Sequence, residues 1–267
     1  YYKDGYEFIL PKSELTKLNY LNTIKSVHRL NDDQATIRYK IALNQCLDRR
    51  YDKSKIQIDA VVNSALKPKE YENLADCLYN DKHYSKAVAL YIKSAETHTS
   101  KAWQYNMAGN CYVLMENYQD AITYYLKAIQ ANPKHISIHR NLGSAYSKIN
   151  DMKNALKSYK IALQEKNPSK SLILNYVEAL FIEGENIDFT EITKSYEYLK
   201  DKKYRLIIDM FQILQSSQRG EDISIKLSSW KEKNDVGELN WDFSQLEAWA
   251  QTEEQKSIVE SFKSKAI

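Results

Sequence analysis

Residues 102–135 read AWQYNMAGNCYVLMENYQDAITYYLKAIQANPKH. In the first half of this stretch, small and large residues recur three and four positions apart, which places them on one face of a helix. After a polar break at 116–120 the spacing returns, and Pro133 ends the second helix because proline cannot continue the hydrogen-bond ladder. The stretch therefore predicts two antiparallel helices. Their inward faces carry Tyr105, Ala108, Gly109 and Tyr112 in the first helix and Ala121, Tyr125 and Ala128 in the second.

The same pattern recurs 34 residues earlier and 34 residues later, which defines three units at 68–101, 102–135 and 136–169. Self-similarity at such a period is the sequence signature of a repeat architecture. Gly109 and Gly143 lie inside predicted helices, where glycine costs about 1 kcal/mol relative to alanine, so we expect a tight helix contact to compensate. The equivalent positions are Tyr71, Leu74, Ala75, Leu78, Ala87, Tyr91 and Ser94 in the earlier unit and His139, Leu142, Gly143, Tyr146, Ala155, Tyr159 and Ala162 in the later one.

These residues resemble the tetratricopeptide repeat (TPR), whose pattern is a large residue, Leu-Gly or Ala-Gly, Tyr, Ala, an aromatic residue and Pro. Residues 170–184 resemble the first helix of a fourth, degenerate unit. The resemblance implies an all-α fold, a right-handed superhelical α-solenoid of helix-turn-helix repeats with atypical helical caps at both ends. We expect helices to dominate and strands to be absent, and a sheet anywhere within 68–169 would contradict the fold.

The chain divides, on this interpretation, into three parts. Residues 1–67 are an N-terminal helical segment with a degenerate repeat, comprising a helix at 15–30 and a helix pair at 35–47 and 55–66. Residues 68–184 are the TPR array, and 185–267 are a C-terminal helical cap.

The C-terminal part contains three stretches that resemble helix-start capping boxes, in which side chains satisfy free amide groups. They begin at Asp188, Ser244 and Thr252 and predict three or more further helices. Three of the four tryptophans also lie there. We expect them to pack in the core of the cap rather than to form an exposed docking patch. They are Trp230, Trp241 and Trp249.

Composition and motifs give no sign of catalysis. The net charge of +3 is too small to indicate nucleic acid, and no apolar run approaches the roughly 20 residues of a membrane span. The six glycines never cluster as a phosphate loop does, and His135 and His139 stand four apart without a third metal ligand. The basic residues at 194–205 could contact phosphate, but a solvent-exposed helix end explains them better than a nucleic-acid site does. We therefore expect no enzyme activity, no catalytic residue, no cofactor, no metal and no nucleic-acid partner.

Three cysteines, Cys46, Cys77 and Cys111, form no C-x-x-C pair, and an odd number cannot all close internal disulfides. A reducing compartment is the simpler interpretation, which favours a cytoplasmic location; a periplasmic or membrane-anchored one remains if a segment preceding Tyr1 was removed. Cys77 and Cys111 occupy one slot in successive units, and helices packed 8–10 Å apart hold such residues too far apart to bridge. Both are interpreted as small buried hydrophobic residues.

The resemblance further implies a concave groove, lined by the first helices, that grips a peptide or a partner helix. Asparagine recurs in one slot at 73, 141 and 175, and its side chain can bond both main-chain groups of an extended peptide. The alternative is that these asparagines brace neighbouring helices or face water. The groove-lining positions are Glu72, Asn73, Asp76, Asn106, Met107, Asn110, Arg140, Asn141, Ser144, Leu174, Asn175 and Glu178. The partner-binding candidates among them are Asn73, Asp76, Asn106, Asn110, Arg140, Asn141, Ser144 and Asn175.

A groove that clamps the C-terminal carboxylate of a chaperone would need Lys and Arg at its slots, where this chain has Glu72 and Asp76 among others. The favoured function is a non-enzymatic adaptor or assembly scaffold that binds a protein or peptide. The alternatives are a secretion-type chaperone and an accessory regulatory domain of a larger anchored or enzymatic protein.

Overall fold

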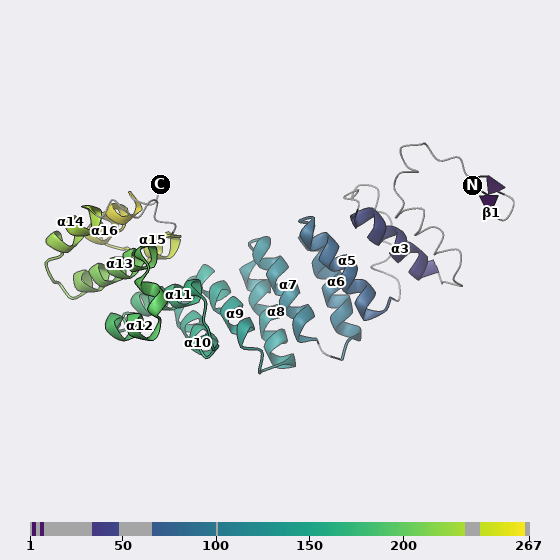
Figure 1. Ribbon diagram of the computed structural model, residues 1–267, viewed down its shortest axis with the longest axis horizontal. Coiled ribbons are helices and arrows are strands. Elements are labelled where there is room, and N and C mark those ends of the chain that lie inside the picture. Colours follow the sequence, from purple (N-terminus) through teal and green to yellow (C-terminus); the bar gives the residue numbers. More distant parts are fainter. Residues whose placement is uncertain are drawn as a thin grey trace. The chain divides into compact units, whose positions relative to one another are not determined.

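The structure is a computed structural model that describes residues 2–3, 6–7, 34–47, 66–99, 101–232 and 241–264 (Figure 1). Helices dominate these residues, as predicted. The expectation that strands are absent is wrong, because β1 (Tyr2–Lys3) pairs antiparallel with β2 (Tyr6–Glu7). No strand occurs among the described residues of 68–169. The expected helices at 15–30 and 55–66 lie outside the described residues.

The helices follow the predicted 34-residue period. The first helices of the four units begin at 68, 102, 136 and 170 and end at 80, 114, 148 and 182, so the expected fourth first helix is present. The second helices of the first three units begin at 84, 118 and 152. These helices are α5 (Pro68–Asn80), α6 (Tyr84–Thr97), α7 (Ala102–Leu114), α8 (Tyr118–Ala131), α9 (Ile136–Lys148), α10 (Met152–Ala162) and α11 (Lys170–Ile182).

Each first helix ends in the same backbone turn, which the sequence pattern did not reveal. Lys82, Glu116, Asn150 and Gly184 stand 34 residues apart and all have a positive φ, between 58° and 74°. In each case the next residue donates its N–H to a carbonyl five positions earlier, as at Asn117 to Tyr112 (2.9 Å). This bond satisfies a free carbonyl at the helix end and turns the chain back. Gly184 is the residue best suited to that conformation, and its position shows that the fourth unit keeps the repeat geometry.

The chain forms two compact units, Tyr1–Asn117 with Gln130–Asn132, and Tyr118–Ile129 with Pro133–Ile267. In the first, α3 (Gln34–Leu47) packs on α5, α5 on α6, and α6 on α7. The helix predicted at 35–47 is therefore confirmed. The inward slots predicted from the sequence are fully buried there, including Leu74, Ala75, Ala87 and Tyr91.

The first unit corrects the interpretation of the cysteines. Cys46, near the end of α3, forms a disulfide with Cys77 on α5, with the two Cα atoms 6.2 Å apart. The sequence argument compared Cys77 only with Cys111, one repeat later, whereas the bridging partner comes from the preceding helix. Cys111 is a free, buried thiol, as predicted, and burial raises its pKa to about 12.

The core packing predicted for the three tryptophans of the C-terminal part is confirmed for Trp230, whereas Trp241 and Trp249 are partly buried against that core. Trp230 is 1% exposed, and Trp249 packs on Phe181 with ring centroids 4.8 Å apart. Trp241 meets Phe211 edge to face at 5.8 Å. The helices around them are α12 (Phe189–Ser195), the 3₁₀ helix η1 (Glu197–Lys200), α13 (Lys202–Gln218), α14 (Ser224–Glu232), α15 (Ser244–Trp249) and α16 (Glu253–Lys263).

Two of the three predicted capping residues act as predicted. Asp188 accepts the N–H of Glu191 at the start of α12, and Thr252 and Gln255 form a reciprocal capping box at the start of α16. The prediction for Ser244 was wrong, because Ser244 is the first residue of α15 itself. The carboxylate of Asp242 accepts the backbone N–H of Ser244 (3.0 Å) and so caps the start of α15, the role predicted for the serine side chain.

Gly143 makes the tight helix contact expected of it. A Cβ added there would lie 2.5 Å from Cε1 of Tyr159 on α10, a ring that is 1% exposed. Two helices can approach this closely only where one of them has no side chain.

We expect Gly143→Ala to lower the free energy of unfolding by about 2 kcal/mol, because forcing a methyl group against a buried ring costs more than the roughly 1 kcal/mol that alanine adds to a helix. Urea unfolding followed by circular dichroism measures the change. In a Tyr159→Ala background, the same substitution should become neutral or stabilising. An equal loss in both backgrounds would contradict the contact.

Candidate partner-binding groove

The candidate residues of the first unit are held by neighbouring helices. The side-chain amide of Asn73 donates to the Tyr39 hydroxyl on α3 (3.2 Å), and the Tyr91 hydroxyl on α6 donates to Asp76 (2.7 Å). Tyr39 stands 34 residues before Asn73 and so occupies the same slot of the preceding helix. Asn73 and Asp76 thus make the bracing contacts named as the alternative for this surface.

The other two candidates of this unit lie on α7. Asn106 and Asn110 are half-buried, and the Asn110 amide contacts the sulfur of Met107 at 3.7 Å. Both are neutral and sit on one face of the helix, four residues apart. They leave the α7 surface polar but without charge.

Glu72 corrects the predicted lining, because its side chain is buried rather than exposed to a groove. It accepts bonds from Lys69 Nζ (3.0 Å), Gln104 Nε2 (2.6 Å) and Ser94 Oγ (3.2 Å). Burial alone would raise the pKa of Glu72, but these three donors outweigh it and hold the pKa below its ordinary value. Glu72 therefore locks α5, α6 and α7 together.

In the second unit, Arg140, Asn141 and Ser144 on α9 and Asn175 on α11 are half-buried. Leu174, also predicted to line the groove, is instead 3% exposed within the hydrophobic core. Ser144 and Asn175 meet in a hollow of about 200 Å³. Its lining consists of Ser144, Ser147, Lys148, Tyr159, Asn175, Glu178, Trp241, Asp242 and Gln245. Arg140 and Asn141 are outside that lining.

The C-terminal part supplies one wall of this hollow. Lys148 at the end of α9 pairs with Asp242, just before α15, at 2.5 Å. The bond from Lys148 holds the pKa of Asp242 down at about 2, and Asp242 raises the pKa of Lys148 in turn. Both side chains are partly exposed, at 41% and 61%, so the ion pair forms the outer rim.

Glu178 lies inside that rim, in the slot that Asp76, Asn110 and Ser144 occupy in earlier units. It is 6% exposed, and burial raises its pKa to about 8. The Trp241 indole lies close enough to favour the charged carboxylate, yet its Nε1 and the Oε1 of Glu178 both lack a hydrogen-bond partner. The sequence analysis named Glu178 as lining but missed Trp241 and Gln245, whose contacts with the repeats span more than 60 residues of chain.

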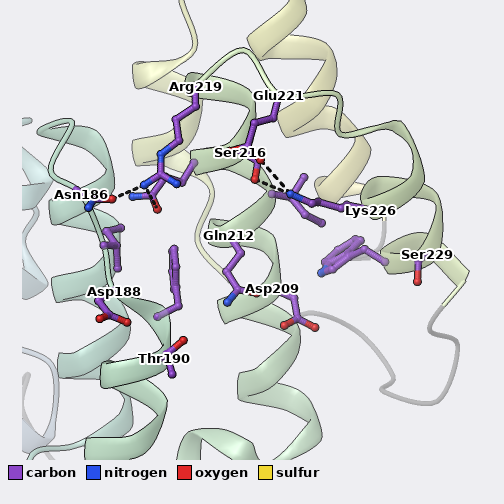
Figure 2. A pocket seen from close by; sticks show the side chains of 15 residues that line it. Asn186, Asp188, Thr190, Asp209, Gln212, Ser216, Arg219, Glu221, Lys226 and Ser229 are labelled. Atoms are coloured by element: carbon purple, nitrogen blue, oxygen red, sulfur yellow. Dashed lines mark hydrogen bonds and ion pairs between the residues drawn. The ribbon is translucent and has the colours of Figure 1, made fainter.

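A larger hollow of about 710 Å³ lies among α12, α13 and α14 (Figure 2). Some of its polar groups bond to one another. Arg219 bonds to Asn186 and Gln215, and Lys226 bonds to Ser216 (2.9 Å) and Glu221 (3.1 Å). Nothing in the sequence pointed to this hollow.

No group of three or more metal-binding side chains occurs in the part of the chain that the structure describes. His135 is exposed at the start of α9, where its Nδ1 lies 2.9 Å from the Ser137 hydroxyl. Over the same residues, no helix is both long and apolar enough to cross a bilayer.

Comparison with known families agrees with the repeat geometry. Residues 109–150 match the family model described as TPR repeat, and 138–171 match the one described as tetratricopeptide repeat. Residues 109–171 are tetratricopeptide repeats. The 34-residue spacing of the first helices continues on both sides of the matched residues, from 68 to 182. No curated protein sequence matches the chain.

Among solved structures, a TPR protein shares the fold. YrrB, described as a TPR protein with an unusual peptide-binding site, is 21% identical and superposes with a TM-score of 0.53 over 62% of this chain and 86% of its own. The C-terminal part of a TPR repeat-containing protein from Cytophaga hutchinsonii is 15% identical, with a TM-score of 0.48 over 95% of this chain and 93% of its own.

Proposed function

We propose that the chain is a non-enzymatic adaptor or assembly scaffold that binds a peptide or a helix of a partner protein along the first helices of its TPR units. The observation that carries the proposal is the strict 34-residue register of α5, α7, α9 and α11. Within each compact unit, this register places the same slots of two consecutive first helices at equivalent positions, on α5 and α7 in the first unit and on α9 and α11 in the second. A stacked repeat of this kind offers an extended surface suited to a chain-like ligand.

The polar character of the slots supports a main-chain contact. Asn106, Asn110, Asn141 and Asn175 are neutral and half-buried, and a side-chain amide can donate to one main-chain group and accept from another. Half-buried amides lose less side-chain freedom on binding than exposed ones, because their neighbours already restrict them.

We expect Asn141→Ala and Asn175→Ala each to weaken partner binding by about 1–2 kcal/mol, the scale of a lost neutral hydrogen bond, or roughly 5- to 30-fold in affinity. The affinity should change little between low and high salt, since neutral contacts are not screened. A partner recovered by affinity purification is titrated against wild type and both variants, with thermal melts alongside.

Gln119→Ala is the matched control, because Gln119 is an exposed amide residue on the second helix α8. Unchanged affinity in the Asn141→Ala, Asn175→Ala double variant would show that these asparagines do not contact the partner. A lower melting temperature with unchanged affinity would assign these asparagines to bracing. Turnover of a substrate that is lost on mutating a groove residue would overturn the adaptor function itself.

A further inference from the structure

The hollow between α9, α11 and the C-terminal part contains three buried polar atoms that have no hydrogen-bond partner. They are Oε1 of Glu178, Oε1 of Gln245 and Nε1 of Trp241. Buried polar groups in native proteins are nearly always paired, so three unpaired atoms in one hollow require an explanation. Two of them need a donor and one needs an acceptor.

The charges around the hollow do not balance when Glu178 is ionised. Lys148 and Asp242 neutralise each other at the rim, and Glu178 is the remaining charged residue of the lining. The ionised carboxylate therefore leaves the hollow with a net charge of −1. Without a cation in the hollow the buried carboxyl favours its neutral form, as its raised pKa of about 8 shows, and a cation bound there would favour the ionised form.

We infer that this hollow binds the free amino terminus of a peptide. The inference rests on the proposed function and names the part of the partner that the second unit recognises. An α-ammonium group donates to Glu178 and Gln245, and the carbonyl of the same residue accepts the Trp241 N–H. The ammonium also supplies the missing positive charge. A lysine side chain carries the same charge but has no carbonyl beside it.

The size and the opening of the hollow suit such a ligand. Its 200 Å³ correspond to roughly seven water volumes of about 30 Å³ each, which is room for one terminal residue and its carbonyl. The unpaired atoms belong to side chains that are less than a tenth exposed (Glu178 and Gln245) or half-buried (Trp241), while Lys148 and Asp242 at the rim are exposed. The rest of the peptide would leave past that rim, beside Ser144 on α9.

The titration of Glu178 gives binding a characteristic pH dependence. Burial raises the pKa of Glu178 to about 8; the Trp241 indole opposes this shift, Asp242 adds to it, and Lys148 on α9 also opposes it. Tyr159 faces the hollow from α10, and burial raises its pKa to about 12, so it stays neutral. A peptide amino terminus has a pKa of about 7.7–8.0. The complex needs an ionised Glu178 and a protonated amine, so affinity should be greatest near pH 8 and fall on both sides.

The test titrates the full chain with Ala-Ala-Ala amide, its N-acetylated form and n-butylamine, which imitates a lysine side chain. Nitrogen-15 NMR follows the indole N–H of Trp241, assigned with Trp241→Phe. We expect the free tripeptide to shift this resonance with the predicted pH optimum. Acetylation should weaken binding at least tenfold. Equal binding of n-butylamine would overturn the amino-terminus assignment in favour of a lysine.

Glu178→Gln keeps the shape of the side chain and should weaken tripeptide binding at least tenfold, with loss of the pH optimum. Glu183→Gln, an exposed glutamate at the end of α11, is the matched control and should bind as wild type does. No shift with any probe, or equal binding in Glu178→Gln, would refute the inference. If Asn141→Ala still lowered the affinity for the partner protein, the adaptor function would stand without the amino-terminus site. If neither Glu178→Gln lowered tripeptide binding nor Asn141→Ala lowered partner affinity, the result would count against the proposed function as well.

Discussion

Replacing Trp230 by alanine should lower the free energy of unfolding by about 3–5 kcal/mol, the range measured for truncating a large aromatic side chain in a core. Trp230 is 1% exposed and meets Phe262 edge to face, with ring centroids 4.7 Å apart. Its indole N–H also donates to the carbonyl of Leu206 (2.9 Å), so the substitution leaves a cavity and a buried carbonyl without its partner. Urea unfolding followed by circular dichroism measures the loss.

Two further variants locate the cause. Trp230→Phe keeps most of the ring volume but not the hydrogen bond, and should cost about 1–3 kcal/mol. Trp103→Ala removes a tryptophan that is 41% exposed and should cost about 1 kcal/mol or less. Hydrogen exchange should show the loss of protection in α13 and α14. Equal losses for Trp230→Ala and Trp103→Ala would contradict the assigned packing.

The repeat could be predicted from the sequence because it depends on local spacing. The slots Ala87, Ala121 and Ala155 and the slots Tyr91, Tyr125 and Tyr159 repeat every 34 residues, and all are buried. Equivalent buried positions of a periodic core need side chains of similar size in each unit, so the repeat can be recognised in the amino-acid sequence.

The environment of each polar slot could not be predicted in the same way. Glu72 and Glu178 are both glutamates on first helices, but Glu72 is held by three donors and Glu178 has an unpaired oxygen. The difference comes from distant residues, Gln104 in one case and Trp241 in the other. Periodicity gives the face of a helix on which a residue lies and says nothing about which segment packs against that face.

The pairing of the cysteines failed as a prediction for a related reason. Cys46 belongs to α3, whose sequence lacks the TPR signature, so its register against α5 was not available from the repeat. Tyr39 and Asn73, 34 residues apart and hydrogen-bonded, now show that α3 follows the same period. A disulfide persists most readily in an oxidising compartment, whereas the odd cysteine count had favoured a reducing one. The location of the protein stays a prediction.

Breaking the disulfide should destabilise the N-terminal end of the first unit. The two cysteines are separated by 31 residues, and closing a loop of that length stabilises the folded state by about 3–4 kcal/mol in the chain-entropy model. Dithiothreitol should therefore lower the melting temperature of the wild type. The Cys46→Ala, Cys77→Ala double variant should melt at the lower temperature with or without reductant.

Cys111 provides the internal control for this prediction. Its thiol is buried, and the pKa raised to about 12 keeps it protonated and slow to react in the folded chain. Alkylation after denaturation without reductant should label one of the three cysteines, and alkylation after reduction should label all three. Labelling of all three without reductant would show that Cys46 and Cys77 remain thiols. In that case their 6.2 Å Cα separation would be a packing contact between α3 and α5, and dithiothreitol should leave the melting temperature unchanged.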